Sequence, residues 1–370
     1  NSTLLGKQYK FQEVRYMSIS KIKFGVTANG DEVTKYTLKN NNGIEVSFID
    51  LGGVITNLMM PDKDGNIDDI VLGYDTVAEY EVNMPSFGAP LGRYANRVSN
   101  AIFTLNGKEY KLDKNESTNC LHGGNTRYNR MMYNAETDVV ENGDSITFSR
   151  LSPDGEQGFP GNLTVAITYT LNDDNELMID YYAVGDEDTI VNMTNHSYFN
   201  LGKGGHKCKD ILDQEITIYA DNYTPVNDIL VPTGEIKSVE GTALDFRNGK
   251  PVREGLGAYD KDEKTVTEYD HNFVLNGDDV CDVAKAAQFV CKETGRMMEV
   301  YTDQPGLQLY TAGGLTTENS KDGINYANFC GACFESQNFP NAINTKGFPN
   351  AVLKAGDEYT TTTVFRFSII

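Results

Sequence analysis

The sequence has 370 residues, 39% of them hydrophobic, and its formal net charge is −21 at pH 7. This length suffices for one large β domain or for two ordinary domains, each with a sizeable core. The negative charge argues against nucleic acid or an anionic membrane surface as a partner, because binding phosphate groups requires a surface rich in Lys and Arg. No stretch approaches the ~20 consecutive apolar residues that a membrane-spanning helix needs.

The N-terminal region shows no signal-peptide pattern, although the chain begins with Asn1 rather than Met. We predict that residues 1–20 form an N-terminal extension. Residues 21–370 are predicted to form a single domain, since no linker, repeat or low-complexity segment interrupts them. Six Cys residues at irregular spacings do not indicate a disulfide framework in a chain this long. We therefore expect a cytoplasmic location and leave a secreted or periplasmic one open.

From residue 33 onward the main pattern is alternation of apolar and polar residues bounded by Gly, Asn and Asp, which indicates β-strands joined by turns. Residues 33–38 and 44–49 flank a turn sequence, which predicts a hairpin. Residues 102–105 and 108–112 flank Asn106-Gly107, the strongest short hairpin signal. Further strands are expected at residues 163–171, 177–183, 189–201, 297–301, 308–311 and 360–367, and a short helix at residues 77–80.

Many short strands separated by turns predict an all-β fold, an antiparallel sandwich or barrel. Several strands carry apolar residues on one face and Thr, Asn or Tyr on the other. An antiparallel sheet can cover a core with one face and leave the other face accessible. We therefore expect a large curved sheet with one face available to a ligand.

Two early segments carry polar groups suited to ligand binding. Residues 92–97 (GRYANR) place two Arg and an Asn in a predicted loop. A guanidinium there can fork onto a carboxylate, a phosphate or vicinal hydroxyls, or it can form a structural salt bridge. Residues 120–124 (CLHGG) place His122 before paired glycines, which would let the backbone approach a ligand closely.

Two later segments add titratable groups. In a strand, His196 shares one face with Thr194 and Tyr198, a pattern that fits either a sugar site or a solvent-facing strand. Asp270 and His271 are adjacent, so at most one of them faces a given site if their segment is a strand.

Glu335 lies in a strand-like segment of mostly small and apolar residues, 331–340 (GACFESQNFP). Burying an unpaired carboxylate is costly, so Glu335 is paired in the fold, used on a ligand or directed outward. Cys330 and Cys333 have the spacing of half a zinc site, but the sequence has no second such pair, and we interpret them as buried free thiols. His206, in a Gly-rich segment, is predicted to lie in an exposed turn.

Taken together, these segments resemble the aldose 1-epimerase, or galactose mutarotase, family. Seven stretches stand in the order that this family shows, and the resemblance extends from about residue 21 to the end of the chain. They are residues 92–97 (GRYANR), 121–124 (LHGG), 152–163 (SPDGEQGFPGNL), 195–201 (NHSYFNL), 270–273 (DHNF), 304–308 (QPGLQ) and 335–340 (ESQNFP).

The resemblance implies a large antiparallel β-sandwich with an open sugar-binding cleft on its concave sheet. It implies an isomerase that interconverts the α and β anomers of free aldohexoses such as glucose and galactose. Neither a metal nor another cofactor is implied. The expected partner is the sugar itself, with no nucleic acid and no membrane, and the expected assembly is a monomer or a homodimer.

Matched residue by residue, the resemblance implies that Glu335 is the general base and His196 the general acid. For the positions left open above, the resemblance implies that Asp270 rather than His271 faces the site, and that Arg97, the second arginine of its segment, does so too. The implied substrate-binding residues are Asn96, Arg97, His122, Asp270 and Gln308.

For this mechanism we expect burial to raise the pKa of Glu335, and neighbouring carboxylates such as Asp270 to raise the pKa of His196. Two alternatives stay open. A hexose-6-phosphate 1-epimerase would need Arg and Lys residues gathered near C6 of the sugar. A non-catalytic module on the same fold would bind a sugar without exchanging its anomers.

Overall fold

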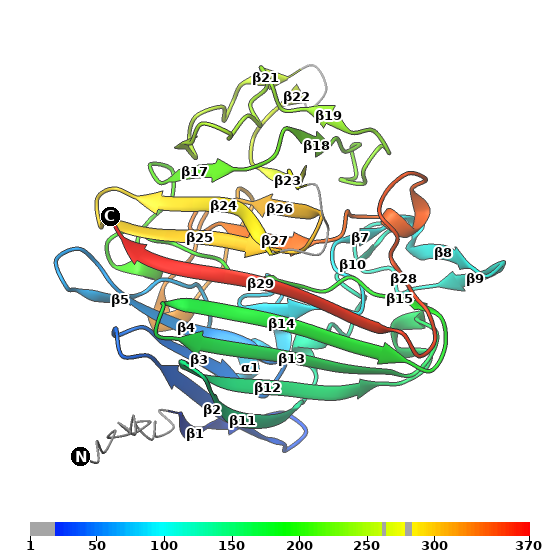
Figure 1. Cartoon of the computed structure of the whole chain (residues 1–370), viewed down its shortest axis with the longest axis horizontal. Helices are drawn as coiled ribbons and strands as arrows, with labels where there is room; N and C mark the ends of the chain where they lie inside the picture. The colour runs from blue at the N-terminus through cyan, green and yellow to red at the C-terminus, as the bar shows by residue number, and fades with distance from the viewer. Residues whose placement is uncertain (1–18, 261–263, 278–282) are drawn as a thin grey trace, which may run out of the picture.

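The computed structural model describes residues 19–260, 264–277 and 283–370 (Figure 1). Residues 1–18, most of the predicted extension, lie outside the described residues, and the first strand, β1, begins at Ser20. Strands dominate the described part of the chain, whose single α-helix, α1 (Val77–Val82), is short. The all-β prediction is therefore confirmed. No helix among the described residues is both long and apolar enough to cross a membrane.

A nine-stranded antiparallel sheet forms the largest layer of the described structure, with the strand order β11-β12-β13-β14-β29-β25-β24-β17-β20. The C-terminal strand β29 (Glu358–Ile369), red in Figure 1, lies near the middle of this sheet between β14 and β25. The other strands are β11 (Asn134–Val140), β12 (Gly143–Ser152), β13 (Leu163–Asn172), β14 (Glu176–Gly185), β17 (Glu215–Ile218), β20 (Lys250–Pro251), β24 (Ala284–Cys291) and β25 (Arg296–Thr302).

Two five-stranded antiparallel sheets accompany the large sheet. The first follows the chain order and comprises β1 (Ser20–Val26), β2 (Glu32–Lys39), β3 (Glu45–Ile49), β4 (Val54–Pro61) and β5 (Ile67–Asp69). The second has the order β19-β18-β23-β26-β27 and comprises β18 (Asn222–Thr224), β19 (Lys237–Ser238), β23 (Asp270–Val274), β26 (Gly306–Tyr310) and β27 (Cys333–Gln337).

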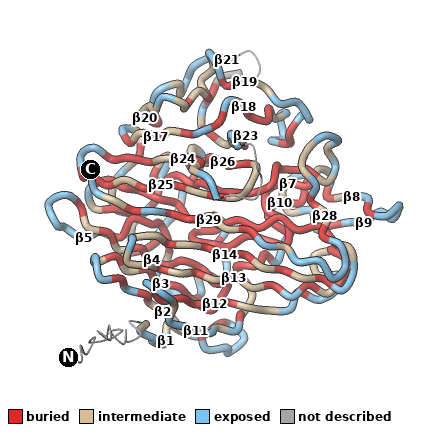
Figure 2. The backbone as a smooth tube through the Cα atoms, viewed as in Figure 1, coloured by how far each residue is buried: buried red, intermediate tan, exposed pale blue. Residues whose placement is uncertain are grey.

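One apolar core joins the three sheets. The rings of Phe48 on β3 and Tyr169 on β13 lie 4.5 Å apart, so the first small sheet packs on the large one. The rings of Phe334 on β27 and Phe289 on β24 lie 5.4 Å apart, so the second small sheet packs there too. Along β13 every second residue is buried, which is the alternation that the sequence pattern predicted (Figure 2).

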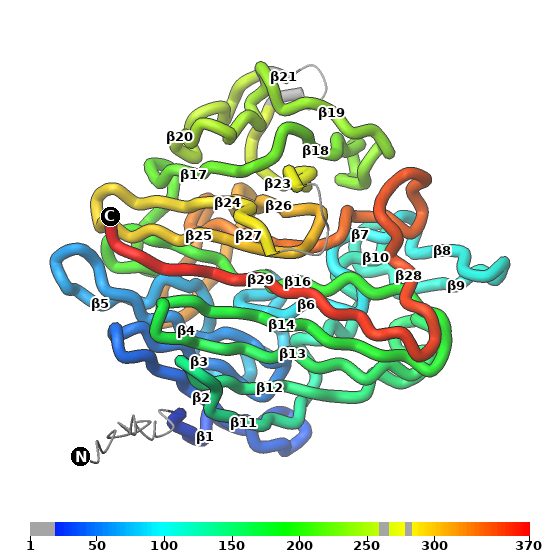
Figure 3. The backbone as a smooth tube through the Cα atoms, viewed as in Figure 1, coloured from blue at the N-terminus to red at the C-terminus, as the bar shows by residue number. Residues whose placement is uncertain are grey.

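Short strand pairs and turns complete the described structure. The pair formed by β6 (Ala89–Leu91) and β16 (Thr194–His196), labelled in Figure 3, carries His196 at the end of β16. The other paired strands are β7 (Arg97–Val98) with β10 (Cys120–Leu121), β8 (Ile102–Leu105) with β9 (Lys108–Lys111), β15 (Thr189–Ile190) with β28 (Val352–Leu353), and β21 (Tyr259–Asp260) with β22 (Lys264–Thr265). The 3₁₀ turns are η1 (Ser99–Ala101), η2 (Tyr128–Arg130), η3 (Glu156–Gly158), η4 (Gly205–Lys207), η5 (Lys321–Gly323) and η6 (Ala342–Asn344).

Both predicted hairpins are confirmed, since β2 pairs with β3 and β8 pairs with β9. Asn106 and Gly107 have φ values of 52° and 78°, the positive values that a two-residue hairpin turn requires. The strand expected at residues 189–201 is divided instead into β15 and β16, which pair with different partners. The turn predicted at His206 is confirmed by η4, but the predicted exposure is wrong, because the imidazole is buried and its Nδ1 lies 3.0 Å from the Tyr326 hydroxyl.

The first arginine of the segment 92–97 has a structural role. Arg93 is 1% exposed. Its Nη1 donates to the carbonyl oxygens of Pro160 and Gly161 at 2.7 and 3.0 Å and to Thr189 Oγ1 at 3.2 Å. Its Nη2 donates to the carbonyl and hydroxyl oxygens of Ser152 at 3.3 and 2.6 Å. The guanidinium therefore joins the end of β12, the loop at Pro160 and Gly161, and the start of β15, and its role is structural.

Arg93→Met should lower the free energy of unfolding by about 3 kcal/mol or more, because it leaves several buried acceptors without a donor. Thermal and urea unfolding would measure the loss. Arg366→Met is the matched control, since Arg366 pairs with Glu176 at the surface and its loss should cost about 1 kcal/mol or less. Equal losses in the two variants would contradict the structural role of Arg93.

Candidate active site

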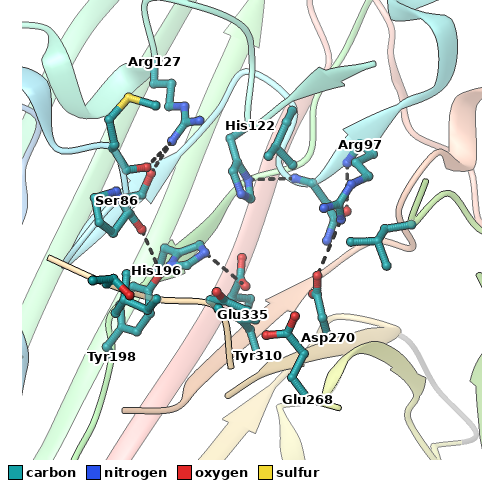
Figure 4. Close-up of a pocket in the computed structure, with 18 residues that line it drawn as sticks. Ser86, Arg97, His122, Arg127, His196, Tyr198, Glu268, Asp270, Tyr310 and Glu335 are labelled. Atoms are coloured by element: carbon teal, nitrogen blue, oxygen red, sulfur yellow. Dashed lines mark hydrogen bonds and ion pairs between the residues drawn. The ribbon is translucent and has the colours of Figure 1, made fainter. Parts of the chain in front are cut away.

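A cleft of about 380 Å³ is lined by residues from β7, β16, β23, β26 and β27 and from the loops beside them (Figure 4). Six of the seven site residues expected from the sequence line this cleft: Asn96, Arg97, His122, His196, Asp270 and Glu335. The seventh, Gln308, does not belong to its lining; its Nε2 donates to Asp270 Oδ1 at 2.6 Å. Gln308 therefore supports Asp270.

Glu335 and His196 face each other in the cleft. Glu335 Oε1 lies 3.6 Å from His196 Nε2, and the two side chains are 2% and 7% exposed. The backbones of Phe199 and Ala332 exchange hydrogen bonds of 2.8 and 3.0 Å, which hold the two segments side by side. Because side chains alternate along a strand, Phe334 enters the core while Glu335 points into the cleft.

Burial controls the protonation of this pair. It raises the pKa of Glu335 well above the usual range, the negative charge of Asp270 adds to the rise, and Arg97 opposes it. The expected increase is therefore confirmed. For His196 the expectation was wrong. Burial lowers the pKa of His196 to about 4, and this effect exceeds the opposing contribution of Asp270.

A thiol lies behind His196. Cys333 Sγ is 3.5 Å from His196 Nδ1, and the cysteine is fully buried on the same strand face as Glu335. Burial raises the pKa of the Cys333 thiol well above its usual value, so the sulfur keeps its proton. Cys120, Cys330 and Cys333 are free, buried cysteines, which confirms the interpretation of Cys330 and Cys333 as buried thiols.

Arg97 and Asp270 form one end of the cleft. The Nε and Nη2 atoms of Arg97 donate to the two carboxylate oxygens of Glu116 at 2.8 and 2.7 Å. Its Nη1 lies 3.9 Å from Oδ2 of Asp270, which also lines the cleft. A fork held by one carboxylate is rigid, and it presents its remaining edge to Asp270 and to a ligand.

Two backbone hydrogen bonds fix His122. Its backbone N–H donates to the carbonyl of Asn96 at 3.0 Å, and the Asn96 N–H donates to His122 Nδ1 at 3.2 Å. Burial, with the nearby His196, lowers the pKa of His122 well below the usual value. A neutral imidazole whose Nδ1 accepts carries its proton on Nε2, so His122 is a hydrogen-bond donor at that atom.

The glycine after His122 serves the protein backbone. A Cβ on Gly123 would lie 2.2 Å from the carbonyl oxygen of Gly92, and its φ is +83°. The close approach expected at the paired glycines is therefore an approach to the loop before Asn96. Gly123 lets these two loops touch and so sets the position of His122.

Sequence reasoning missed several lining residues, among them Ser86, Arg127, Glu268 and Tyr310. Glu268 stands two residues before Asp270, so period-two spacing was a usable signal for it. The others lacked a comparable signal, because long-range folding brings them to the cleft. Among the described residues, no group of three or more His, Cys, Asp or Glu side chains is arranged to hold a metal ion.

A sequence model described as aldose 1-epimerase matches residues 34–366. The galactose mutarotase of Bos taurus is 43% identical over 359 residues, which cover 95% of this chain and 99% of the relative. The aldose 1-epimerase of Escherichia coli is 34% identical, covering 92% of this chain and 96% of the relative.

Solved structures give the same likeness. A crystal structure of an aldose epimerase homologue from C. elegans superposes with a TM-score of 0.82 at 30% identity, covering 90% of this chain and 98% of that one. The galactose 1-epimerase of Lactobacillus acidophilus superposes with a TM-score of 0.83 at 25% identity, covering 96% and 99% of the two chains.

Gly123→Ala should displace His122 and slow turnover, because the added methyl group would collide with the backbone at Gly92. Gly107→Ala is the matched control, since Gly107 also has a positive φ but has open space around its Cβ position. Backbone strain alone should cost each variant about 1 kcal/mol of stability. In Gly123→Ala the collision with Gly92 should add to this loss and should also lower kcat. Normal kcat in a folded Gly123→Ala variant would refute this positioning role.

Proposed function

The chain belongs to the aldose 1-epimerase family, and from this premise we propose how its cleft performs the reaction. The protein is an isomerase that interconverts the α and β anomers of aldohexoses. The observation that carries the proposed mechanism is the pairing of Glu335 Oε1 with His196 Nε2 at 3.6 Å inside the cleft. One carboxylate and one imidazole at this separation can act on the two oxygens bonded to C1 of a sugar.

Ring opening requires two proton transfers. Glu335 removes the proton of the C1 hydroxyl, the C1–O5 bond breaks, and His196 donates a proton to O5. The product is a free aldehyde, which rotates about the C1–C2 bond. Reclosure runs the same transfers in reverse: His196 takes the proton from the C5 hydroxyl as O5 attacks C1, and Glu335 returns its proton to O1. Attack on the other face of the carbonyl gives the other anomer.

The pair needs one proton in total. Before ring opening Glu335 is ionised and His196 is protonated; afterwards Glu335 holds the proton and His196 is neutral. Burial favours the second arrangement, because it raises the pKa of Glu335 and lowers that of His196 to about 4. The cleft thus favours the protonation state that the pair has when the open-chain sugar is bound. The same single proton on the pair serves ring closure on either face of the aldehyde.

The other lining groups position the sugar. The Arg97 fork and the Asp270 carboxylate suit a pair of vicinal hydroxyls, and Gln308 holds Asp270 in place. His122, with its proton on Nε2, donates toward the ring or a hydroxyl. Asn96 links His122 to Arg97, because its N–H donates to His122 Nδ1 and its Oδ1 accepts from the Arg97 N–H. Holding the reacting oxygens next to acid and base converts a bimolecular reaction into an intramolecular one.

Galactose and glucose are the substrates that fit this proposal. Relatives named galactose mutarotase support galactose in particular. The hexose-6-phosphate alternative is disfavoured because, among the described residues, only two cationic side chains, Arg97 and Arg127, line the cleft, and Arg97 already pairs with carboxylates. The catalytically silent alternative is disfavoured because acid and base both face the cleft.

Glu335→Gln and His196→Asn should each lower kcat by about 10²–10⁴-fold, because each removes one proton-transfer group while nearly preserving shape. Polarimetry on freshly dissolved α-galactose would measure the rate. His206→Asn is the matched control for a buried histidine outside the cleft and should keep the wild-type rate. A wild-type rate in either cleft variant would remove that residue from the chemistry.

A further inference from the structure

The polar groups of the cleft stand in a definite order (Figure 4). At one end Arg97 lies 3.9 Å from Asp270, and in the middle Glu335 lies 3.6 Å from His196. Tyr198 lies on the far side of His196, and the centroids of the two rings are 5.0 Å apart. The order therefore runs from Asp270 through Glu335 and His196 to Tyr198.

Arg127 continues this order. The Tyr198 hydroxyl donates to the carbonyl of Pro85 at 2.9 Å, and the next residue, Ser86, accepts a hydrogen bond of 2.7 Å from Arg127 Nη1. Arg127 and Ser86 both line the cleft. The guanidinium of Arg127 thus stands beyond His196, at the end opposite Asp270.

A bound sugar must follow the same order, a step that rests on the proposed function. A pyranose with O1 at Glu335 and O5 at His196 places C2 and C3 on the Asp270 side, since C2 is bonded to C1. C5 is bonded to O5, so C5 and its substituent C6 lie beyond His196. The group on C6 therefore meets the wall formed by Ser86, Tyr198 and Arg127.

Arg127 is a buried cation that has no partner of opposite charge in the part of the chain that the structure describes. It is 8% exposed, and its Nη1 donates only to neutral groups, Ser86 Oγ and the carbonyl of Met84 at 3.1 Å. Within residues 19–260, 264–277 and 283–370, no carboxylate forms an ion pair with Arg127, and its Nε and Nη2 make no hydrogen bond. Burying an unpaired charge is costly, and burial lowers the pKa of Arg127 to about 10.

Three other arginines near the cleft are held by buried oxygen atoms or by carboxylates of the fold. Arg97 is held by Glu116, Arg150 by Glu156, and Arg93 by buried oxygen atoms. Of the two arginines that line the cleft, Arg97 pairs with Glu116 and lies near Asp270, whereas Arg127 has no carboxylate partner among the described residues. This difference points to a ligand group that completes its coordination.

We propose that Arg127 recognises a carboxylate on C6, so that the enzyme anomerises hexuronates as well as neutral aldohexoses. A carboxylate is planar and can accept two parallel hydrogen bonds from one guanidinium. A phosphate dianion would need further donors, and no lysine stands among the described residues that line the cleft. The neutral hydroxymethyl group of galactose would leave the cation uncompensated.

The remaining charges of the cleft orient such a substrate. Glu268, Asp270 and Glu335 also line the cleft, and burial, together with the charge of Asp270, raises the pKa of both other carboxylates. A hexuronate bound in reverse would bring its carboxylate against this acidic wall. The charge on Arg127 also contributes to the low pKa of His196, so a carboxylate on Arg127 would favour the protonated acid.

The test compares galacturonate with galactose, using polarimetry on fresh α-anomers and the ratio of their kcat/KM values. In the wild-type enzyme this ratio should be at least one. Arg127→Gln should lower the ratio by about 10- to 100-fold, because hydrogen bonds to charged groups are the stronger ones. The ratio for Arg127→Lys should lie between the ratios of the wild-type enzyme and Arg127→Gln, since lysine keeps the charge but cannot form the two parallel hydrogen bonds. Arg130→Gln, which removes a neighbouring cation outside the lining, should change the ratio by less than about threefold.

Three results would overturn the proposal: a wild-type enzyme that anomerises galactose but not galacturonate, an unchanged ratio in folded Arg127→Gln, or a higher kcat/KM for galactose 6-phosphate than for galacturonate. The wild-type ratio tests the proposal even if an Arg127 variant fails to fold. A wild-type enzyme inactive on both galactose and galacturonate would instead refute the proposed function.

Discussion

The burial of Glu335 against His196 is the interaction on which the rest of the site depends. A carboxylate in a strand of apolar and small residues is stable only as a neutral acid or beside a proton donor. Strand pairing provides that arrangement: β27 directs Glu335 into the cleft, and the hydrogen bonds between Phe199 and Ala332 bring His196 to it. The pairing of this carboxylate with this imidazole is therefore a consequence of strand pairing.

A supporting layer holds the polar groups that face the cleft. Glu116 fixes Arg97, Gln308 fixes Asp270, and the Asn96 backbone fixes the tautomer of His122. Cys333 takes the corresponding place behind His196. Such contacts keep these side chains in place, which is what the proposed positioning of a sugar requires. Arg127 differs from Arg97, the other arginine that lines the cleft, because its hydrogen-bond partners among the described residues are all neutral, whereas Arg97 pairs with Glu116. This difference is the basis for proposing that Arg127 binds a ligand.

Local sequence signals predicted much of the fold. Asn106-Gly107 marked a hairpin correctly, because two-residue turns need residues that tolerate positive φ. The segment 189–201 had strand-like alternation but forms two separate strands, because β15 and β16 pair with distant partners that no local pattern reveals. The resemblance to a family identified seven residues, six of which line one cleft in the structure. The seventh, Gln308, lies behind Asp270.

Burial depth was the quantity that the sequence could not supply. It reversed the expected shift of the His196 pKa, since desolvation outweighs the nearby Asp270 charge. It also turned His206 from an exposed residue into a buried one. Cys333 escaped notice as a neighbour of His196 because 137 positions separate them in the chain.

The most direct measurement is a pH titration of the Glu335 carboxyl and the His196 imidazole by NMR on isotope-labelled protein. Glu335→Gln and His196→Asn would assign the two resonances. We predict a Glu335 pKa well above 4.5 and a His196 imidazole that stays neutral until the pH approaches about 4. An ionised Glu335 beside a cationic His196 at neutral pH in the empty cleft would contradict the claim that burial sets the protonation of this pair.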